Sequence, residues 1–301
     1  MDIKQLEVFL SVAHHLSFSK AAEEMYVSQP TVSAYISSLE KQLNTQLLIR
    51  NTKEVSLTKA GQELLNYAQK ILSLRDQALQ SIGGASQKAN GSLDIIASTI
   101  PGQHLLPEII ASFHKTWPNI IIKVSQTDSR HVEQEMIGFR YDFGMSGTIP
   151  SDDRLIHYPV FQDELVLVVP NSLTDSAESI RQNFSSFVLK HPFIMRESGS
   201  GTRAEIESLL TKSGVSLRSL RTPAFFSDAH GVLGAVAYGM GISLISQIAA
   251  SMYVEAGLLR SIEMQSPLFN RQIHLLHNKE LWLSPLQQAF ADHVQNFYLK
   301  N

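Results

Sequence analysis

The hydrophobic residues of segment 27–43, VSQPTVSAYISSLEKQL, repeat with the period of an α-helix. They recur at i, i+4, i+7 and i+11 and predict one apolar stripe, formed by Val32, Ile36, Leu39 and Leu43. Ser28 can cap this helix through its hydroxyl, and Pro30 falls in the first turn, where a missing N–H costs nothing. The opposite face carries short, uncharged side chains, most of which donate and accept hydrogen bonds: Gln29, Thr31, Ser33, Ala34 and Ser37.

A second short helix is predicted directly before the first, in SFSKAAEEMYV, with Ser19 or Ser17 as its cap. Two short helices joined at residues 25–27 form a helix-turn-helix, whose second helix enters the DNA major groove with its N-terminal residues against base edges. Gln can bond bidentately to adenine, Ser and Thr bond to several bases, and apolar atoms of Thr or Ala touch a thymine methyl. The alternative is a helical hairpin whose polar face meets only water.

Residues 47–58, LLIRNTKEVSLT, predict two short strands around the turn Asn51-Thr52. Such a hairpin would form a wing that places Arg50 and Lys53 beside the phosphate backbone, where contacts set register without specifying sequence. A solvated hairpin with ordinary surface charges remains open.

A helix of about 24 residues follows, capped by Thr58 and ended by Gly83-Gly84. Its residues repeat at heptad spacing in two seams, namely Leu65, Leu72 and Leu79, and Ala68, Arg75 and Ile82. This spacing favours pairing with another long helix, and a plain amphipathic helix is the alternative.

The chain changes character after SQKANGS at 86–92, a polar segment typical of a flexible join. Short apolar runs then alternate with helical stretches: LDIIAS, IIIKVSQ, DFGMSG, LVLVVP, HPFIMR and ISLIS. This alternation predicts an α/β architecture, with the runs as buried strands of a mostly parallel sheet.

Ligands in open α/β sheets bind beyond the carboxyl ends of the strands. The candidate residues there are Ser98, Thr99, Ile100, Thr127, Ser129, Ser146, Thr148, Ser198, Ser200, Gly201, Thr202, Arg203, Asp228 and His230. In RESGSGTR (196–203) glycine allows close approach, and a helix starting near Thr202 would direct N–H groups at an anion. Arg203 can add a charge-assisted pair. The alternatives are a loop that only caps a helix and, for Asp228, a plain helix cap.

The formal net charge of −3 divides into +1 for residues 1–90 and −4 for the rest. A nucleic-acid partner must therefore be argued from local placement. The chain has no Cys, which excludes disulfides, thiolate metal sites and thiol-based oxidant sensing. We see no signal peptide and no long apolar run, and expect a cytoplasmic protein without membrane contact. No catalytic motif or metal-ligand spacing occurs, so we expect no enzyme activity, no metal and no cofactor.

Residues 1–90 resemble the N-terminal domain of LysR-type transcriptional regulators over LEVFLSVAHHLSFSKAAEEMYVSQPTVSAYISSLEKQL, TQLLIRN and VSLTKAGQELL. The remaining two-thirds are compatible with the effector domain of that family. The resemblance implies a multidomain α+β and α/β protein with a winged helix-turn-helix (1–58), a dimerising linker helix (59–84), a hinge (85–90) and an effector-binding domain (91–301). That domain would be periplasmic-binding-protein-like, with one lobe at about 91–161 and 268–301 and the other at about 162–267.

The resemblance also implies double-stranded DNA and RNA polymerase as partners and a homodimer or homotetramer. Similar regulators often carry Arg or Lys where this chain has Ala34 and Ser37, which weakens the expectation of guanine readout. Phosphate anchoring then falls to Arg50, Lys53 and Lys59.

The sequence therefore predicts a DNA-binding regulator controlled by a small anionic effector between two lobes. The competing hypothesis is a two-lobed binding protein or transferase whose N-terminal domain only oligomerises.

Overall fold

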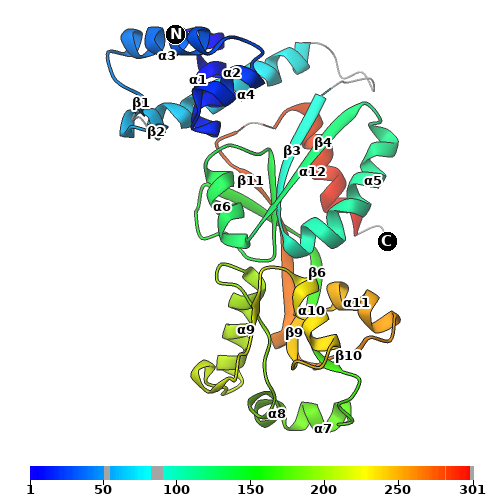
Figure 1. Ribbon diagram of the computed structural model, residues 1–301. Helices are drawn as coiled ribbons and strands as arrows, with labels where there is room; N and C mark the ends of the chain where they lie inside the picture. Colours follow the sequence, from blue (N-terminus) through cyan, green and yellow to red (C-terminus); the bar gives the residue numbers. More distant parts are fainter. Residues whose placement is uncertain (51–54, 83–90, 282, 299–301) are drawn as a thin grey trace. The chain divides into compact units, whose positions relative to one another are not determined.

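The structure is a computed structural model that describes residues 1–50, 55–82, 91–281 and 283–298 (Figure 1). Lys53, the turn at Asn51-Thr52, the Gly83-Gly84 stop and the predicted hinge at 85–90 lie outside the described residues, as does the side chain of Arg50. The chain divides into two compact units, and each is described by itself. No helix among the described residues is long and apolar enough to cross a membrane.

The first unit contains the predicted helix-turn-helix and hairpin. Its elements are α1 (Ile3–His15), α2 (Phe18–Glu24), α3 (Gln29–Leu43), β1 (Leu48–Arg50), β2 (Val55–Leu57) and α4 (Lys59–Ile82). Ser17 caps α2 by accepting from the Lys20 N–H, and Ser28 caps α3 by accepting from the Thr31 N–H. The predicted α3 stripe packs into the core at Val32, Ile36 and Leu39, which are fully buried.

The hairpin is attached to α3 through one carboxylate. Glu40 Oε1 accepts from the Leu47 N–H over 2.9 Å and from the Leu48 N–H over 3.2 Å. Thr58 caps α4 as predicted, because its Oγ1 accepts from the Gly61 N–H. These caps are encoded locally, which is why the sequence pattern located them.

Helix α4 packs its N-terminal half against the core of its own unit. Leu65 and Ala68, the first residues of the two predicted seams, are buried there. Arg75, which interrupts the apolar repeat, donates from Nη1 to Glu7 Oε1 of α1 over 2.6 Å. Leu79 is 64% exposed, so the seam is available to another helix only toward its C-terminal end.

The second unit has α/β structure in two lobes. The first lobe contains β3 (Gly91–Ser98), a π-helical turn (Pro101–Leu105), α5 (Leu106–Thr116), β4 (Ile120–Thr127), α6 (Ser129–Ile137), β5 (Phe143–Ser146) and α12 (Pro285–Phe297). The second contains α7 (Ala177–Gln182), α8 (Phe184–Lys190), β7 (Met195–Arg196), α9 (Gly201–Lys212), η2 (Leu217–Ser219), β8 (Phe225–Phe226), α10 (Ala229–Ala237), β9 (Ser243–Ser246), α11 (Gln247–Glu255), β10 (Leu259–Ile262) and η3 (Pro267–Phe269).

Two long strands, β6 (Leu155–Pro170) and β11 (Asn270–Asn278), belong to both lobes (Figure 1). They pair with each other from Leu155 to Glu164, and β11 also pairs with β5. The C-terminal half of β6 pairs with β9 and β10 in the second lobe. Its residues alternate there between two buried clusters, with Leu165, Leu167 and Val169 in one and Val166 and Val168 in the other.

The prediction of a mostly parallel sheet was wrong. Strand β3 pairs in parallel with β4 and β5, but β6 and β11 form only antiparallel pairs. Exposed residues interrupt the first half of β6 at His157, Pro159 and Gln162, so its apolar pattern is weaker than that of a doubly buried strand. Strand β4 is not buried as predicted, because it lies at the sheet edge and leaves Ile121 64% exposed.

Candidate functional site

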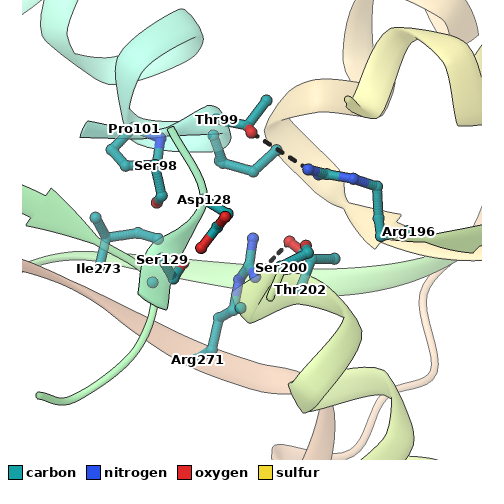
Figure 2. A pocket seen from close by; sticks show the side chains of 13 residues that line it. Ser98, Thr99, Pro101, Asp128, Ser129, Arg196, Ser200, Thr202, Arg271 and Ile273 are labelled. Carbon is teal, nitrogen blue, oxygen red and sulfur yellow. Dashed lines mark hydrogen bonds between the residues drawn. The ribbon is translucent and has the colours of Figure 1, made fainter. Parts of the chain in front are cut away.

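An inner pocket lies where the two lobes meet at the ends of β3, β4 and β5 (Figure 2). Its free volume is about 10 Å³, room for a water-sized group. The residues that line it are Ser98, Thr99, Ile100, Pro101, Asp128, Ser129, Gly147, Arg196, Ser200, Gly201, Thr202, Arg271 and Ile273.

A larger outer chamber adjoins the inner pocket and shares Thr99 and Asp128 with it. Its volume is about 550 Å³. The residues that line it are Thr99, Gln103, Gln126, Thr127, Asp128, Glu197, Ser227, Asp228 and His230. A chamber of this size fits a small metabolite, whereas the inner pocket admits only one end of such a molecule.

Local chain geometry brings these residues together. Ser98 and Asp128 follow the parallel strands β3 and β4, whose carboxyl ends meet at one edge. Helix α9 begins at Gly201, and Ser200 caps it by accepting from the Arg203 N–H. Asp228 caps α10, where its Oδ1 accepts from the Gly231 N–H over 2.7 Å. The predicted helix start and the alternative role of Asp228 as a cap are both observed.

Arg196 is the buried cation of the inner pocket. It is only 2% exposed, and its Nη2 donates to Thr99 Oγ1, to the Ser227 carbonyl and, over 3.4 Å, to Glu197 Oε1. Its Nε has no hydrogen-bond partner among the described residues. Burial lowers the pKa of the guanidinium, and the carboxylates of Glu197 and Asp228 partly offset this. The Nε of Arg196 is therefore a buried donor without an acceptor among the described residues.

Arg271, in contrast, is matched by a buried carboxylate. Its Nε donates to Asp163 Oδ2 over 2.8 Å, and its Nη1 donates to Thr202 Oγ1 over 3.1 Å. Ser246 Oγ donates to the other oxygen of Asp163 over 2.8 Å. Arg271 therefore links β11 to β6 through Asp163 and to helix α9 through Thr202, and Figure 2 shows the second of these bonds.

The pKa values of two further groups are shifted near the chamber, that of Asp128 in its lining and that of His104 beside the lining residue His230. Burial raises the pKa of Asp128, but hydrogen bonds from the backbone N–H and ring of His131 outweigh it, so the pKa is lowered overall. Burial lowers the pKa of His104, and the neighbouring His230, whose ring centre is 6.1 Å away, lowers it further.

The structure places ten of the predicted effector residues around these two cavities. Seven line the inner pocket, namely Ser98, Thr99, Ile100, Ser129, Ser200, Gly201 and Thr202, and Thr127, Asp228 and His230 line the outer chamber.

The other four predicted residues lie elsewhere. Ser146 and Thr148 bond to each other in a turn, and Ser198 is exposed. Arg203 turns away from the inner pocket, because its Nε donates to Glu207 Oε1 over 2.7 Å, one helical turn ahead.

Sequence analysis did not single out Arg196 or Arg271. Arg196 opens the segment RESGSGTR and could have been suspected. Arg271 reaches the pocket from β11, which comes after every candidate segment in the sequence, and no local signal marks it.

The candidate DNA surface is the N-terminal part of α3. Gln29, Pro30, Ala34 and Ser37 are exposed, whereas Thr31 and Ser33 are partly buried. The hydroxyls of Ser28 and Thr31 lie 2.8 Å apart and bond to each other in the cap. Lys59 is exposed at the start of α4. Gln29 therefore has the largest hydrogen-bonding side chain at this end of the helix.

No group of three or more His, Cys, Asp or Glu residues that could hold a metal occurs among the described residues.

Two family models match the chain. The model for the bacterial regulatory helix-turn-helix protein of the lysR family matches residues 3–62, and the model for the LysR substrate binding domain matches residues 86–298.

Curated relatives are similar along almost the whole chain. A probable RuBisCO transcriptional regulator of Cyanidioschyzon merolae is 28% identical, with 98% of this chain and 97% of the relative covered. An uncharacterized HTH-type transcriptional regulator of Methanocaldococcus jannaschii is 30% identical, with 92% of this chain and 93% of the relative covered.

Solved structures share the fold. Full-length OxyR from Pseudomonas aeruginosa matches with a TM-score of 0.74 at 20% identity, covering 98% of this chain and 95% of that one. Full-length CbnR complexed with its target DNA matches with a TM-score of 0.63 at 21% identity, covering 98% of this chain and 99% of that one. The Synechocystis CcmR regulatory domain in complex with 2-PG matches with a TM-score of 0.62 at 22% identity, covering 69% of this chain and 97% of that one.

Proposed function

Because the chain belongs to the LysR family of transcriptional regulators, we propose that a small effector with an acidic group binds at its inner pocket and controls DNA binding by α3. As a member of that family it is a DNA-binding regulator with an effector-binding domain and not an enzyme. The chemistry of the effector, the DNA-contacting residues and the assembly are the proposed parts.

Arg196 carries the proposal of an acidic group. Its Nε is unpartnered among the described residues, and its one carboxylate contact, to Glu197, is 3.4 Å long, so this buried guanidinium can take a further negative partner. The N-terminus of α9 adds donors at the same pocket through Gly201, the first residue of the helix. A carboxylate or phosphate oxygen would satisfy both sets of donors.

On DNA, Gln29 would bond base edges, with Pro30, Thr31 and Ser33 beside it. Arg50, Lys53 and Lys59 would contact phosphates and set the register. Ala34 and Ser37 leave the middle of the exposed face uncharged. Specificity in this proposal comes from hydrogen bonds at the helix N-terminus rather than from arginine–guanine pairs.

The regulator would act as a homodimer or homotetramer in the cytoplasm and communicate with RNA polymerase. Residues 59–84 would dimerise and place two α3 helices on a two-fold site. The exposed side chains of Leu74 and Leu79 on α4 support this role. An effector changes DNA binding only if its affinity differs between two arrangements of the assembly.

The test is a thermal-shift screen of small carboxylic and phosphorylated acids against the full chain, followed by the same screen on Arg196→Met. An acid at 100 times its Kd stabilises the native state by about 2.7 kcal/mol, or roughly 5–10 °C in a domain of this size. We expect Arg196→Met to abolish that shift. Arg218→Met is the control, because Arg218 is exposed in the same lobe. Binding of the acids that survives Arg196→Met, or no binding of any acid, contradicts the proposal.

A further inference from the structure

The outer chamber is lined by acidic groups. Asp128, Glu197 and Asp228 contribute three carboxylates, and none of the residues lining it is a Lys or Arg. The hydrogen bonds of the described residues use only one oxygen each of Glu197 and Asp228. The second oxygen of each is therefore available to a donor in the chamber.

The nearby basic side chains offset these carboxylates only in part, because Arg196 pairs with Glu197 over 3.4 Å and the His131 ring bonds Asp128. Arg271 is already paired with Asp163, whose Oδ2 lies 2.7 Å from Nη2. Around the two cavities, the single positive charge of Arg196 therefore faces the three negative charges of Asp128, Glu197 and Asp228. A simple anion would bring a further negative charge beside them, and like charges close together repel. The local charge favours a molecule that is negative at one end and positive at the other.

The cavity sizes give this molecule an orientation. The inner pocket, of about 10 Å³, admits a small group beside Arg196, and the outer chamber, of about 550 Å³, holds the rest. The cavities meet at Thr99 and Asp128, so a ligand crossing that boundary passes from the buried guanidinium to the carboxylates. A primary ammonium supplies three donors for carboxylate oxygens.

We propose that the effector is a zwitterion, an amino acid or a closely similar compound, with its carboxylate toward Arg196 and its ammonium among Asp128, Glu197 and Asp228. This inference rests on the proposed function for the acidic group and adds a cationic group to it. The buried Arg196, whose Nε has no partner among the described residues, accounts for the acidic end of the ligand, and the carboxylate-lined chamber accounts for the cationic end.

The experiment measures binding of matched pairs to the full chain, each pair being a 2-amino acid and the 2-hydroxy acid with the same side chain. The panel covers the standard amino acids other than proline, screened by thermal shift, with Kd values from calorimetry for those that bind. The two members of a pair share the carboxylate and differ in the ammonium. We expect at least one amino acid to bind at least tenfold more tightly than its hydroxy acid.

Two variants test the location of the ammonium. Glu197→Gln with Asp228→Asn removes two charges, while Asn can still cap α10 through its oxygen. We expect this double variant to bind the amino acid at least tenfold more weakly than wild type does, and to bind the hydroxy acid equally tightly or more tightly. Glu255→Gln is the control, because Glu255 is exposed in the same lobe and away from the chamber.

The outcomes separate the two proposals. If hydroxy acids bind as tightly as their amino acids, or if the double variant weakens both equally, the zwitterion is wrong and the acidic-group proposal stands. If no member of any pair binds the wild type, the zwitterion is overturned, and the acidic-group proposal falls as well if none of the carboxylic and phosphorylated acids of the wider screen binds.

Discussion

Asp163 is the buried carboxylate whose removal should most weaken the effector domain. It is 2% exposed and accepts from Arg271 Nε over 2.8 Å and from Ser246 Oγ over 2.8 Å. Asp163→Ala leaves the Arg271 guanidinium, itself 7% exposed, without its counter-charge. Breaking a buried pair in this way costs about 3–5 kcal/mol, because desolvation of the remaining charge is no longer offset.

The magnitude predicts a shift in the melting temperature of roughly 6–20 °C, from about 2–4 °C per kcal/mol for a domain of 150–250 residues. Calorimetry on the full chain measures it, and urea denaturation at constant m gives the free energy of unfolding. Replacing both partners, Asp163→Leu with Arg271→Met, should cost much less than Asp163→Ala, since no charge stays buried. Asp153→Ala is the control, because the Asp153 side chain is 94% exposed and its pair with Lys279 contributes little.

A cost below about 1 kcal/mol for Asp163→Ala would refute the reasoning. So would a double variant whose loss of stability equals the sum of the losses caused by Asp163→Leu alone and Arg271→Met alone. Either result would mean that the pair is not a coupled, desolvated unit linking β6 to β11.

Three further substitutions test the first unit and both lobes of the second unit. A Cβ at Gly61 would lie 2.0 Å from the Leu47 carbonyl oxygen, so Gly61→Ala should destabilise the DNA-binding domain by about 1–3 kcal/mol in thermal melts. Gly234→Ala in α10, where nothing lies within 4 Å of the added Cβ, should instead stabilise by about 0.5–1 kcal/mol, and equal effects would contradict the geometry. Burial first, and then the Asp94 carboxyl, raise the pKa of Asp142 to about 6 from 3.8, against hydrogen bonds from the Asp94 N–H and Gln287. The folded state therefore binds this proton more tightly than the unfolded state, and the stability it contributes below pH 3.8 is lost as pH rises through about 6. The shift corresponds to at most about 3 kcal/mol, an upper bound because the side chain is partly exposed. The free energy of unfolding, measured from pH 4 to 7, should fall less steeply with pH for Asp142→Asn than for wild type. Parallel curves for the two proteins would contradict this prediction.

The sequence predicted the first unit well because its signals are local. Ser17, Ser28 and Thr58 cap helices that begin directly after them. The α3 stripe packs as predicted at Val32, Ile36 and Leu39, but Leu43, its predicted fourth residue, is 39% exposed. The heptad seam of α4 was predicted less completely. Leu65 and Ala68 fit both a partner helix and the helix α1 of the same unit, and spacing alone does not distinguish these.

The candidate effector site was predicted in part, for reasons of topology. Residues after β3 and β4 are adjacent in space because parallel strands end at one edge, so Ser98, Thr99 and Ser129 were found. Arg271 comes from β11, which runs antiparallel between β5 and β6 and carries an alternating pattern with no ligand motif. Arg203 was expected at the pocket but points along α9 to Glu207, whereas Arg196 in β7 enters it.

The central claim is that α3 recognises DNA sequence through its N-terminal residues. Fluorescence anisotropy with duplexes from beside its own gene and with random duplexes, across a salt series from about 50 to 200 mM, tests this for wild type, Gln29→Ala and Gln42→Ala. Gln42 is the control, because it is exposed near the other end of the same helix.

We expect wild type to prefer its own sequence with a salt slope that reports several phosphate contacts. Gln29→Ala should lose about 1–3 kcal/mol of binding free energy on the specific duplex only, which is roughly a 5- to 150-fold loss of affinity. The slope of its affinity against salt should stay unchanged. Equal loss on both duplexes, or no loss at all, would contradict recognition through this end of α3.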